Sequence, residues 1–126
     1  MSEIKEDAFK GLETWGNAVA KQDMAAVLNC YVASATLWPT LSNKLRTTTA
    51  EIQDYFELFL PKISGSVEWN HVNCQVINDD YCVCAGTYTF DLTSGKTVAR
   101  FTYTLTKQAT GEWKILHHHS SLQVDE

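Results

Sequence analysis

The segment WKILHHHSS (residues 113–121) begins as an apolar, strand-forming run and ends in three histidines and two serines. Successive side chains of a β-strand point to opposite faces. Strict alternation therefore predicts one face that starts apolar and turns polar, made of Trp113, Ile115, His117, His119 and Ser121. His118 and Ser120 would point to the other face. Because buried polar groups need hydrogen-bonding partners, the segment predicts a strand that leads into a polar pocket.

Three similar segments precede this strand. We predict strands over 67–77, 81–92, 98–107 and 112–122, since all four segments are rich in Val, Thr, Tyr, Phe and Trp. The segments are separated by turn signals, namely Asn78-Asp79-Asp80, Thr93-Ser94-Gly95-Lys96 and Ala109-Thr110-Gly111. Long strands joined by short turns predict an antiparallel meander.

The first half of the chain has helical periodicity instead. Apolar residues recur at spacings of three and four from Ile4 onward, which predicts a long helix that runs to about Gln22. Asp23 is a predicted cap for a short helix over 24–31, and a strand is predicted over 35–38. The Thr48-x-x-Glu51 capping box opens a third helix, which Pro61 ends. Helices followed by strands indicate an α+β fold, a single domain over residues 1–126 with helices packed on one face of a bent sheet.

The composition is that of a globular protein, with 126 residues, 44% hydrophobic and 20% charged. The formal net charge of −5 argues against nucleic acid or an anionic membrane surface as the main partner. No apolar run approaches the ~20 residues of a membrane span. The first residues lack the basic and apolar regions of a secretory signal, so we expect a cytoplasmic protein, although a transit peptide already removed would leave no trace.

The four cysteines, Cys30, Cys74, Cys82 and Cys84, contain no Cys-x-x-Cys spacing. We expect them to be small buried hydrophobic residues in a reducing compartment, rather than disulfide partners or metal ligands.

Five segments together resemble a known family. They are TLWPTLS (36–42), DYFELFL (54–60), GTYTF (86–90), ARFTY (99–103) and WKILHHHSS (113–121). Over nearly the whole chain they resemble the association (hub) domain of calcium/calmodulin-dependent protein kinase II and its stand-alone bacterial and algal relatives. The resemblance implies the cone-shaped fold of nuclear transport factor 2 and of SnoaL-like proteins, in which helices pack on a strongly curved antiparallel sheet around a pocket. It also implies homo-oligomers, from dimers to stacked rings.

One branch of these relatives, the iota-class carbonic anhydrases, shares the His-His-Ser-Ser ending. This resemblance implies a lyase that interconverts carbon dioxide and bicarbonate, with Thr40, Tyr55 and Ser121 as the polar groups of its pocket. Hydration without a metal needs a bound water, a proton acceptor and donors for the growing negative charge. His119, on the predicted face of Ser121, is the expected proton-handling group. Each of these residues also has a purely structural interpretation, as a backbone partner, a core aromatic or a strand end.

A metal site is the alternative use of the histidines. His117 and His119 form a His-x-His pair on one predicted face, and a zinc ion bound there would activate water. The third ligand would have to be His71 or a cysteine, and the sequence does not bring either of them close. We therefore expect no metal and no other cofactor, with zinc at His117 and His119 as the alternative.

The expected ligand is a small molecule or anion, either bicarbonate or a small carboxylate. The resemblance implies a cavity that contains arginines, and a guanidinium at Arg100 would hold a carboxylate in bidentate fashion. Arg46 is a weaker candidate for the same role. The predicted substrate-binding residues are Arg100, His117, Ser120, Tyr88 and Thr102. Whether Ser120 or Ser121 faces the pocket stays open.

Two other functions also stay open. The chain would be a non-catalytic oligomerisation (hub) module if its pocket were only a small-carboxylate-binding or relic site. An isomerase or hydrolase of the polyketide-cyclase-like group would need an Asp or Glu base in the cavity. The carboxylates considered for that role, Glu68, Asp91 and Glu112, all fall near strand ends or turns.

Overall fold

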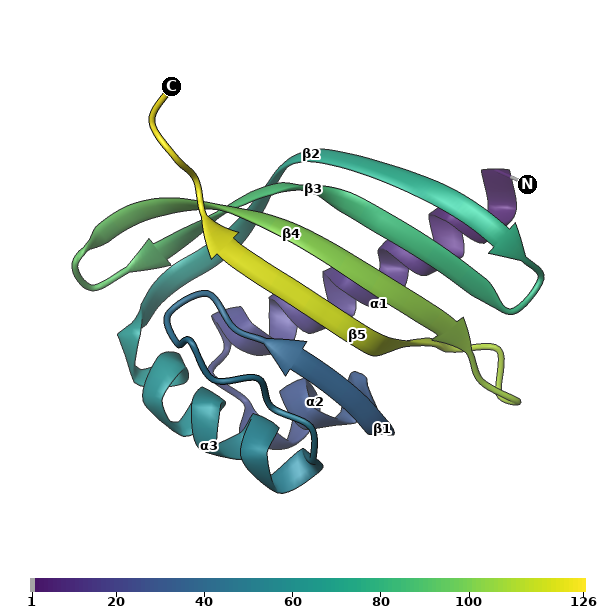
Figure 1. Cartoon of the computed structure of the whole chain (residues 1–126), viewed down its shortest axis with the longest axis horizontal. Helices are drawn as coiled ribbons and strands as arrows, with labels where there is room; N and C mark the ends of the chain where they lie inside the picture. Colours follow the sequence, from purple (N-terminus) through teal and green to yellow (C-terminus); the bar gives the residue numbers. More distant parts are fainter. Residues whose placement is uncertain (1) are drawn as a thin grey trace.

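A computed structural model describes residues 2–126 (Figure 1). The first half contains α1 (Ser2–Ala20), α2 (Met24–Asn29), β1 (Tyr31–Trp38), α3 (Thr49–Phe59) and the short 3-10 helix η1 (Leu60–Lys62). The second half is all strand, with β2 (Ile63–Asn78), β3 (Tyr81–Leu92), β4 (Gly95–Lys107) and β5 (Trp113–Leu122). The predicted α+β order is confirmed. No helix within residues 2–126 combines the length and the apolar character needed to cross a membrane.

The helices begin where their capping residues lie. The Asp23 carboxylate accepts a hydrogen bond from Ala26 N at 3.1 Å, and the Thr48 hydroxyl accepts one from Glu51 N at 3.1 Å. The long helix ends at Ala20 rather than Gln22, because Gln22 adopts a φ of 57° and turns the chain. The second helix ends at Asn29 rather than Tyr31, because Tyr31 already pairs with β5.

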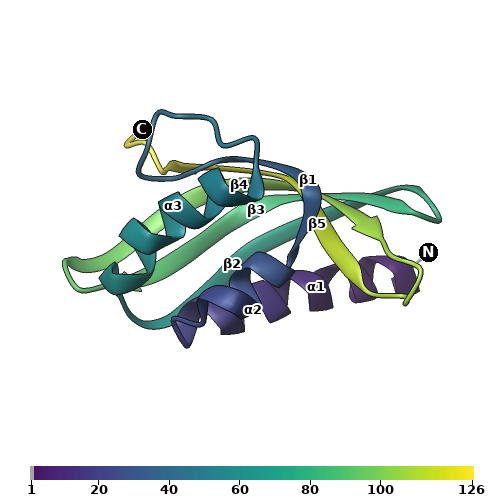
Figure 2. The same cartoon turned by 90° about the horizontal axis from the view of Figure 1, so that it is seen from below.

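The sheet has the strand order β1-β5-β4-β3-β2. The strands β2 to β5 form the predicted antiparallel meander, and β1 adds to its edge in parallel with β5. α1 runs across one face of this sheet with α2 beside it, and α3 lies next to α2 and β1 (Figures 1 and 2). We call the helix-covered face the inner face. At Gly86 on β3 the backbone of His71 on β2 approaches so closely that a Cβ atom would overlap it, so this position requires glycine.

A β-bulge in β5 changes which side chains reach the inner face. Leu105 on β4 pairs with Ile115 and the adjacent Thr104 pairs with His117, so Leu116 is an extra residue on the β5 side. After the bulge the alternation is reversed, and His118 and Ser120 are the buried residues, with 2% and 3% of their surface exposed. The predicted inward face of His117, His119 and Ser121 is therefore wrong. The physical reason is that alternation is a property of a regular ladder, which the bulge interrupts.

The prediction for the cysteines also needs a correction. Cys74 on β2 and Cys84 on β3 lie directly opposite each other and form a disulfide, whereas Cys30 and Cys82 are buried free thiols. The sequence spacing does not reveal the pair, because the register that brings the two strands together is set by the turn at residues 78–81.

Candidate active site

A small cavity lies on the inner face between α1, α3 and the sheet. Its volume is about 10 Å³, which is about the space that one water molecule needs. The polar side chains in its wall belong to Thr40, Tyr55, Tyr88, His118 and Ser120. Apolar and aromatic residues complete the wall: Trp15, Leu37, Pro39, Phe56, Phe59 and Phe90. No Asp or Glu belongs to this lining within the described residues.

A chain of hydrogen bonds runs through the buried side of this cavity. The Trp15 indole donates to the Tyr31 hydroxyl at 3.1 Å, and that hydroxyl lies 3.0 Å from His118 Nδ1. On the other side of the ring, His118 Nε2 lies 3.0 Å from the Tyr88 hydroxyl. Tyr88 donates to the Ser120 hydroxyl at 2.6 Å, and Ser120 lies 2.5 Å from Thr40 Oγ1. Both ring nitrogens of a fully buried imidazole are thus satisfied.

The donor at each step fixes the tautomer of His118. Because Trp15 can only donate, and because Tyr88 gives its proton to Ser120, the consistent arrangement has His118 Nε2 donating to Tyr88 and Nδ1 accepting from Tyr31. The imidazole is then neutral. Burial lowers the pKa of His118 well below its usual 6.5, because the charged form loses its hydration. The ring also stacks on Tyr103, with centroids 4.0 Å apart.

Tyr55 brings a hydroxyl from α3 to the opposite wall. Its oxygen accepts a hydrogen bond from Leu41 N at 3.4 Å. Burial raises the pKa of Tyr55 to about 12, although the hydrogen bonds from Leu41 and the Thr40 hydroxyl and the charge of Arg46 act to lower it. Tyr55 therefore stays protonated at neutral pH and can donate a hydrogen bond into the cavity.

A second hollow adjoins the cavity and opens outward. It measures about 250 Å³, and Tyr55 and Phe59 belong to the walls of both. Arg46 and Lys62 supply two cations to its lining. Arg46 is 7% exposed, and its guanidinium donates to Ser42 Oγ at 2.9 Å and lies 5.7 Å from the centre of the Tyr55 ring. Two cationic residues thus line a hollow that shares two wall residues with the cavity.

Four of the residues singled out in the sequence converge here, and five do not. Thr40, Tyr55, Tyr88 and Ser120 line the cavity. The other five lie on the outer face of the sheet: His117, His119, Ser121, Arg100 and Thr102. On that face His117 Nδ1 lies 2.6 Å from the Thr36 hydroxyl, and His119 is exposed beside Trp38. These five side chains cannot contact a molecule in the cavity.

Sequence reasoning missed His118 and gave too little weight to Arg46. A signal for His118 was present, because the consecutive apolar residues Ile115 and Leu116 already break the alternation of the strand. Arg46 gave no such signal. It is positioned by a bridge between its backbone and that of Leu37, which no local pattern announces.

The predicted zinc alternative lacks a ligand set around the histidines. Within residues 2–126, neither His117 nor His119 belongs to a group of three side chains placed to share a metal ion. His71 lies on β2, paired with Thr87 on β3, whereas His117 pairs with Thr104 on β4. The group of three that does occur is made of cysteines, namely Cys74, Cys82 and Cys84.

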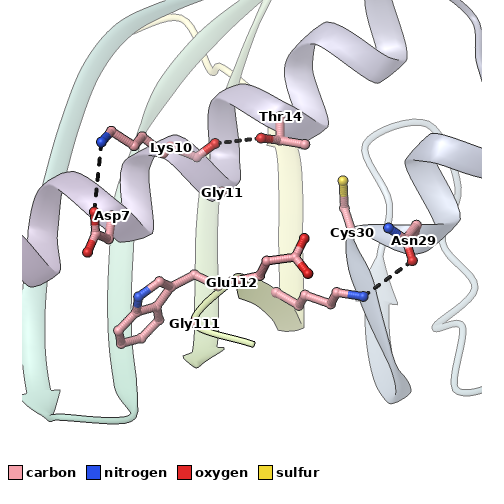
Figure 3. A pocket seen from close by; sticks show the side chains of 10 residues that line it. Asp7, Lys10, Gly11, Thr14, Asn29, Cys30, Gly111 and Glu112 are labelled. Carbon is pink, nitrogen blue, oxygen red and sulfur yellow. Dashed lines mark hydrogen bonds and ion pairs between the residues drawn. The ribbon is translucent and has the colours of Figure 1, made fainter. Parts of the chain in front are cut away.

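A larger hollow of about 290 Å³ lies elsewhere, between α1, the end of α2 and the turn before β5 (Figure 3). Its charged groups bind one another or their neighbours, since Lys10 lies 3.9 Å from Asp7 and Lys114 donates to Asn29 at 3.3 Å. Burial raises the pKa of its thiol, Cys30, to about 11, so this sulfur stays protonated. None of the predicted catalytic or substrate-binding residues lines this hollow, whereas Glu112, one of the carboxylates considered for the isomerase or hydrolase alternative, does.

Comparisons with known proteins agree with this architecture. The family model of the calcium/calmodulin dependent protein kinase II association domain matches residues 4–124. A solved structure from Xanthomonas campestris, described as such a domain, is 32% identical, with coverage of 91% of this chain and 84% of that chain and a TM-score of 0.81. No curated protein matches the chain.

More distant structures share the fold alone. A ketosteroid isomerase-like protein from Erwinia carotovora atroseptica is 13% identical, with coverage of 94% of this chain and 95% of that one and a TM-score of 0.79. An NTF2-like protein of unknown function from Pseudomonas putida is 15% identical, with coverage of 99% of this chain and 90% of that chain and a TM-score of 0.81. The expected fold of nuclear transport factor 2 is confirmed. With its family model matched over almost its whole length, the chain belongs to the calcium/calmodulin dependent protein kinase II association domain family.

Proposed function

We propose that this protein is a lyase that interconverts carbon dioxide and bicarbonate in the inner-face cavity, with no metal in the chemical step. The proposal rests on one observation above all, the convergence of four hydroxyl groups and a neutral imidazole on a space of about 10 Å³. A water molecule fits this space and finds both donors and acceptors in its wall. The residues assigned to the reaction are Thr40, Tyr55, Tyr88, His118 and Ser120.

The hydroxyls serve two roles in this reaction. Ser120 and Thr40, 2.5 Å apart, hold the attacking water through its proton and its lone pair. As water adds to carbon dioxide, negative charge grows on the oxygens of the nascent bicarbonate. The Tyr55 hydroxyl stabilises that charge by donating a hydrogen bond from a fixed position in a nearly dry site.

The proton of the attacking water leaves along the hydrogen-bond chain. It passes to Ser120, while Ser120, which already accepts from Tyr88, passes its own proton to Thr40. Thr40 is half-buried and releases a proton towards solvent. Because burial lowers the pKa of His118, the imidazole stays neutral, and its Nε2–H donates to Tyr88 and so keeps the Tyr88 hydroxyl directed at Ser120. His118 thus orients the hydroxyls of the chain, whereas proton handling, which the sequence analysis expected of His119, falls to Ser120 and Thr40.

The size and charge of the site favour this substrate over a larger one. A cavity of about 10 Å³ has room for about one water molecule, so the walls must move to admit carbon dioxide, and a ring-sized substrate would need a much larger rearrangement of the aromatic lining. An isomerase of the ketosteroid type uses a carboxylate base, and no carboxylate of the described residues lines the cavity. Arg46 and Lys62 in the adjoining hollow attract bicarbonate.

Stopped-flow measurement of carbon dioxide hydration tests the proposal. Chelator-treated protein, with its metal content measured, should accelerate hydration above the buffer rate. Tyr55→Phe should lower that acceleration by about 10- to 1000-fold, the range for a lost donor to a developing oxyanion. Tyr81→Phe, at an exposed tyrosine remote from the cavity, is the matched control. A rate equal to buffer, with and without added zinc, would refute the proposal.

A second candidate is a non-catalytic oligomerisation module, which the family membership favours. The specific observation is a set of apolar side chains exposed near the β1–β5 edge of the sheet, with Trp38 45%, Leu122 46% and Val124 55% exposed. Burial of this patch against a second copy of the chain would remove it from water. Sedimentation of wild type and Trp38→Ser tests this, because only the variant should shift to a smaller species. Loss of Thr40 or Tyr55 would then change no property except stability.

A further inference from the structure

Three cysteine sulfurs gather at the far end of the β2–β3 pair, away from the proposed active site. Cys74 on β2 lies directly opposite Cys84 on β3, and Cys82 lies two residues before Cys84 on the same face of β3. The three Sγ atoms lie within 4.8 Å of one another. In this structure Cys74 and Cys84 are joined as a disulfide and Cys82 is a free thiol. Nothing in the proposed carbon dioxide chemistry uses these residues.

The surroundings of the cluster differ on its two sides. Cys82 and Cys84 have no exposed surface and face the core under α1. Cys74 is half-buried on β2, which is an edge strand, and it lines a hollow of about 430 Å³ together with Lys5, Glu6 and Phe9. Lys5 and Glu6 place one cationic and one acidic side chain at the border of this hollow. The cluster therefore has one half-buried cysteine beside a hollow and two cysteines in the core.

We propose that Cys74, Cys82 and Cys84 form a redox-gated site for a soft, thiol-binding cation with a filled d shell. The Cys74–Cys84 disulfide closes the site, because two of its three ligands are then bonded to each other. Reduction of that disulfide by an external thiol or phosphine opens it. This site goes beyond the proposed function and is independent of it.

The gating step balances as a two-electron reduction. A thiolate from the external reductant attacks Cys74 Sγ through the hollow, the S–S bond breaks, and Cys84 leaves as a thiolate that takes up a proton. A second reductant thiol releases the mixed disulfide at Cys74, so two external thiols become one external disulfide. Binding of the cation then displaces the thiol protons, as metal–thiolate bonds require.

The ligand set selects the class of cation. All three donors are sulfur atoms, and thiolates favour soft metals over Mg²⁺ or Ca²⁺. Zinc usually takes four ligands in structural sites, and the described residues offer three here. A soft cation that accepts three thiolates fits better, because the three sulfur atoms lie within 4.8 Å of one another.

Cadmium titration of the full chain tests the site. Protein reduced with a phosphine that does not bind the metal strongly should take up one Cd²⁺ per chain, with an ultraviolet sulfur-to-metal charge-transfer band. Protein kept oxidised should show no such band. Cys82→Ser, which leaves the Cys74–Cys84 pair intact, should weaken binding by at least about tenfold after reduction. Cys30→Ser, at the other buried free thiol, should bind like wild type.

Several results would overturn the proposal. They are equal cadmium binding by reduced and oxidised protein, full binding by reduced Cys82→Ser, or loss of binding in a folded Cys30→Ser. Circular dichroism of each variant before reduction establishes that it is folded. If Cys82→Ser does not fold, Cys74→Ser at the half-buried position gives the same test, and its binding of cadmium with wild-type affinity would equally refute the site.

Discussion

The two faces of β5 beyond Leu116 carry the same kinds of side chain in opposite surroundings. On the inner face, His118 and Ser120 are 2% and 3% exposed, and every polar atom of the imidazole has a partner. On the outer face, His119 is exposed and His117 and Ser121 are half-buried. Composition therefore says little about which of these five residues do chemistry. Burial with complete hydrogen bonding turns a histidine and a serine into fixed, oriented groups, whereas their neighbours remain solvated.

The largest contrast between the faces should appear in stability. His118→Ala removes a buried ring that stacks on Tyr103, leaves the Tyr31 hydroxyl proton without its acceptor, and removes the donor to the Tyr88 oxygen. We expect the free energy of unfolding to fall by about 3–5 kcal/mol. His119→Ala on the exposed face should change it by no more than about 0.5 kcal/mol. Urea unfolding of both variants measures the difference, and equal losses would mean that the faces are not distinct.

The next contrast concerns catalysis. Ser120→Ala removes the hydroxyl that joins Tyr88 to Thr40, whereas Ser121→Ala removes an outer-face hydroxyl with the same chemistry. If the proposed reaction occurs, Ser120→Ala should lower the hydration rate by about 100- to 1000-fold, the scale of a lost water-positioning or oxyanion group. The hydration rate of Ser121→Ala should stay within about twofold of the wild-type rate, because the outer-face hydroxyl makes no hydrogen bond to the reacting groups. A large loss of rate in Ser121→Ala with little loss in Ser120→Ala would mean that the active site lies on the outer face, the face that strict alternation predicts.

The fold was far more predictable than the orientation of its site residues. Helical periodicity located α1, the capping residues Asp23 and Thr48 located two helix starts, and the strand over 81–92 has the predicted bounds. These signals are local, and each depends on a few consecutive residues. Thr40 and Tyr55 came from the resemblance, and the structure brings both to one cavity.

What local patterns could not supply is tertiary register. The extra residue at Leu116 depends on how β5 pairs with β4, and that pairing alone decides that His118 rather than His119 is buried. The parallel addition of β1 and the approach of Cys74 to Cys84 are long-range in the same way. Arg46 is placed near Tyr55 by a loop and one bridge to β1, so its burial follows from the assembled fold.

The pH dependence of stability offers a third contrast between the faces. Burial lowers the folded-state pKa of His118 below its ordinary value of 6.5, so between those two values the unfolded chain binds a proton that the folded chain does not. The free energy of unfolding should therefore fall as the pH drops below 6.5, by about 1.4 kcal/mol per pH unit from this residue. Desolvation also lowers the pKa of His117. Because that ring is half-exposed, water screens the effect, and its contribution to the pH dependence is smaller.

Two glutamine variants separate the contributions to this slope. His118→Gln keeps a donor and an acceptor but cannot be protonated, and it should flatten the slope measured by urea unfolding between about pH 7 and pH 5.5. His119→Gln on the outer face is the matched control. An unchanged slope in folded His118→Gln would show that the neutral burial of this imidazole does not govern acid sensitivity.

The smallest contrast compares one hydrogen bond on each face. Tyr31→Phe removes the buried hydroxyl that links Trp15 to His118 and leaves the indole N–H and the ring nitrogen unpaired. It should cost about 1–3 kcal/mol, because unpaired buried polar groups lose their hydration without compensation. Thr36→Val removes the partner of half-exposed His117, whose nitrogen can bind water instead, and should cost about 0.5 kcal/mol or less. A Thr36→Val loss as large as that of Tyr31→Phe would mean that the outer histidine is held as firmly as the inner one, and the asymmetry of β5 would then need another physical explanation.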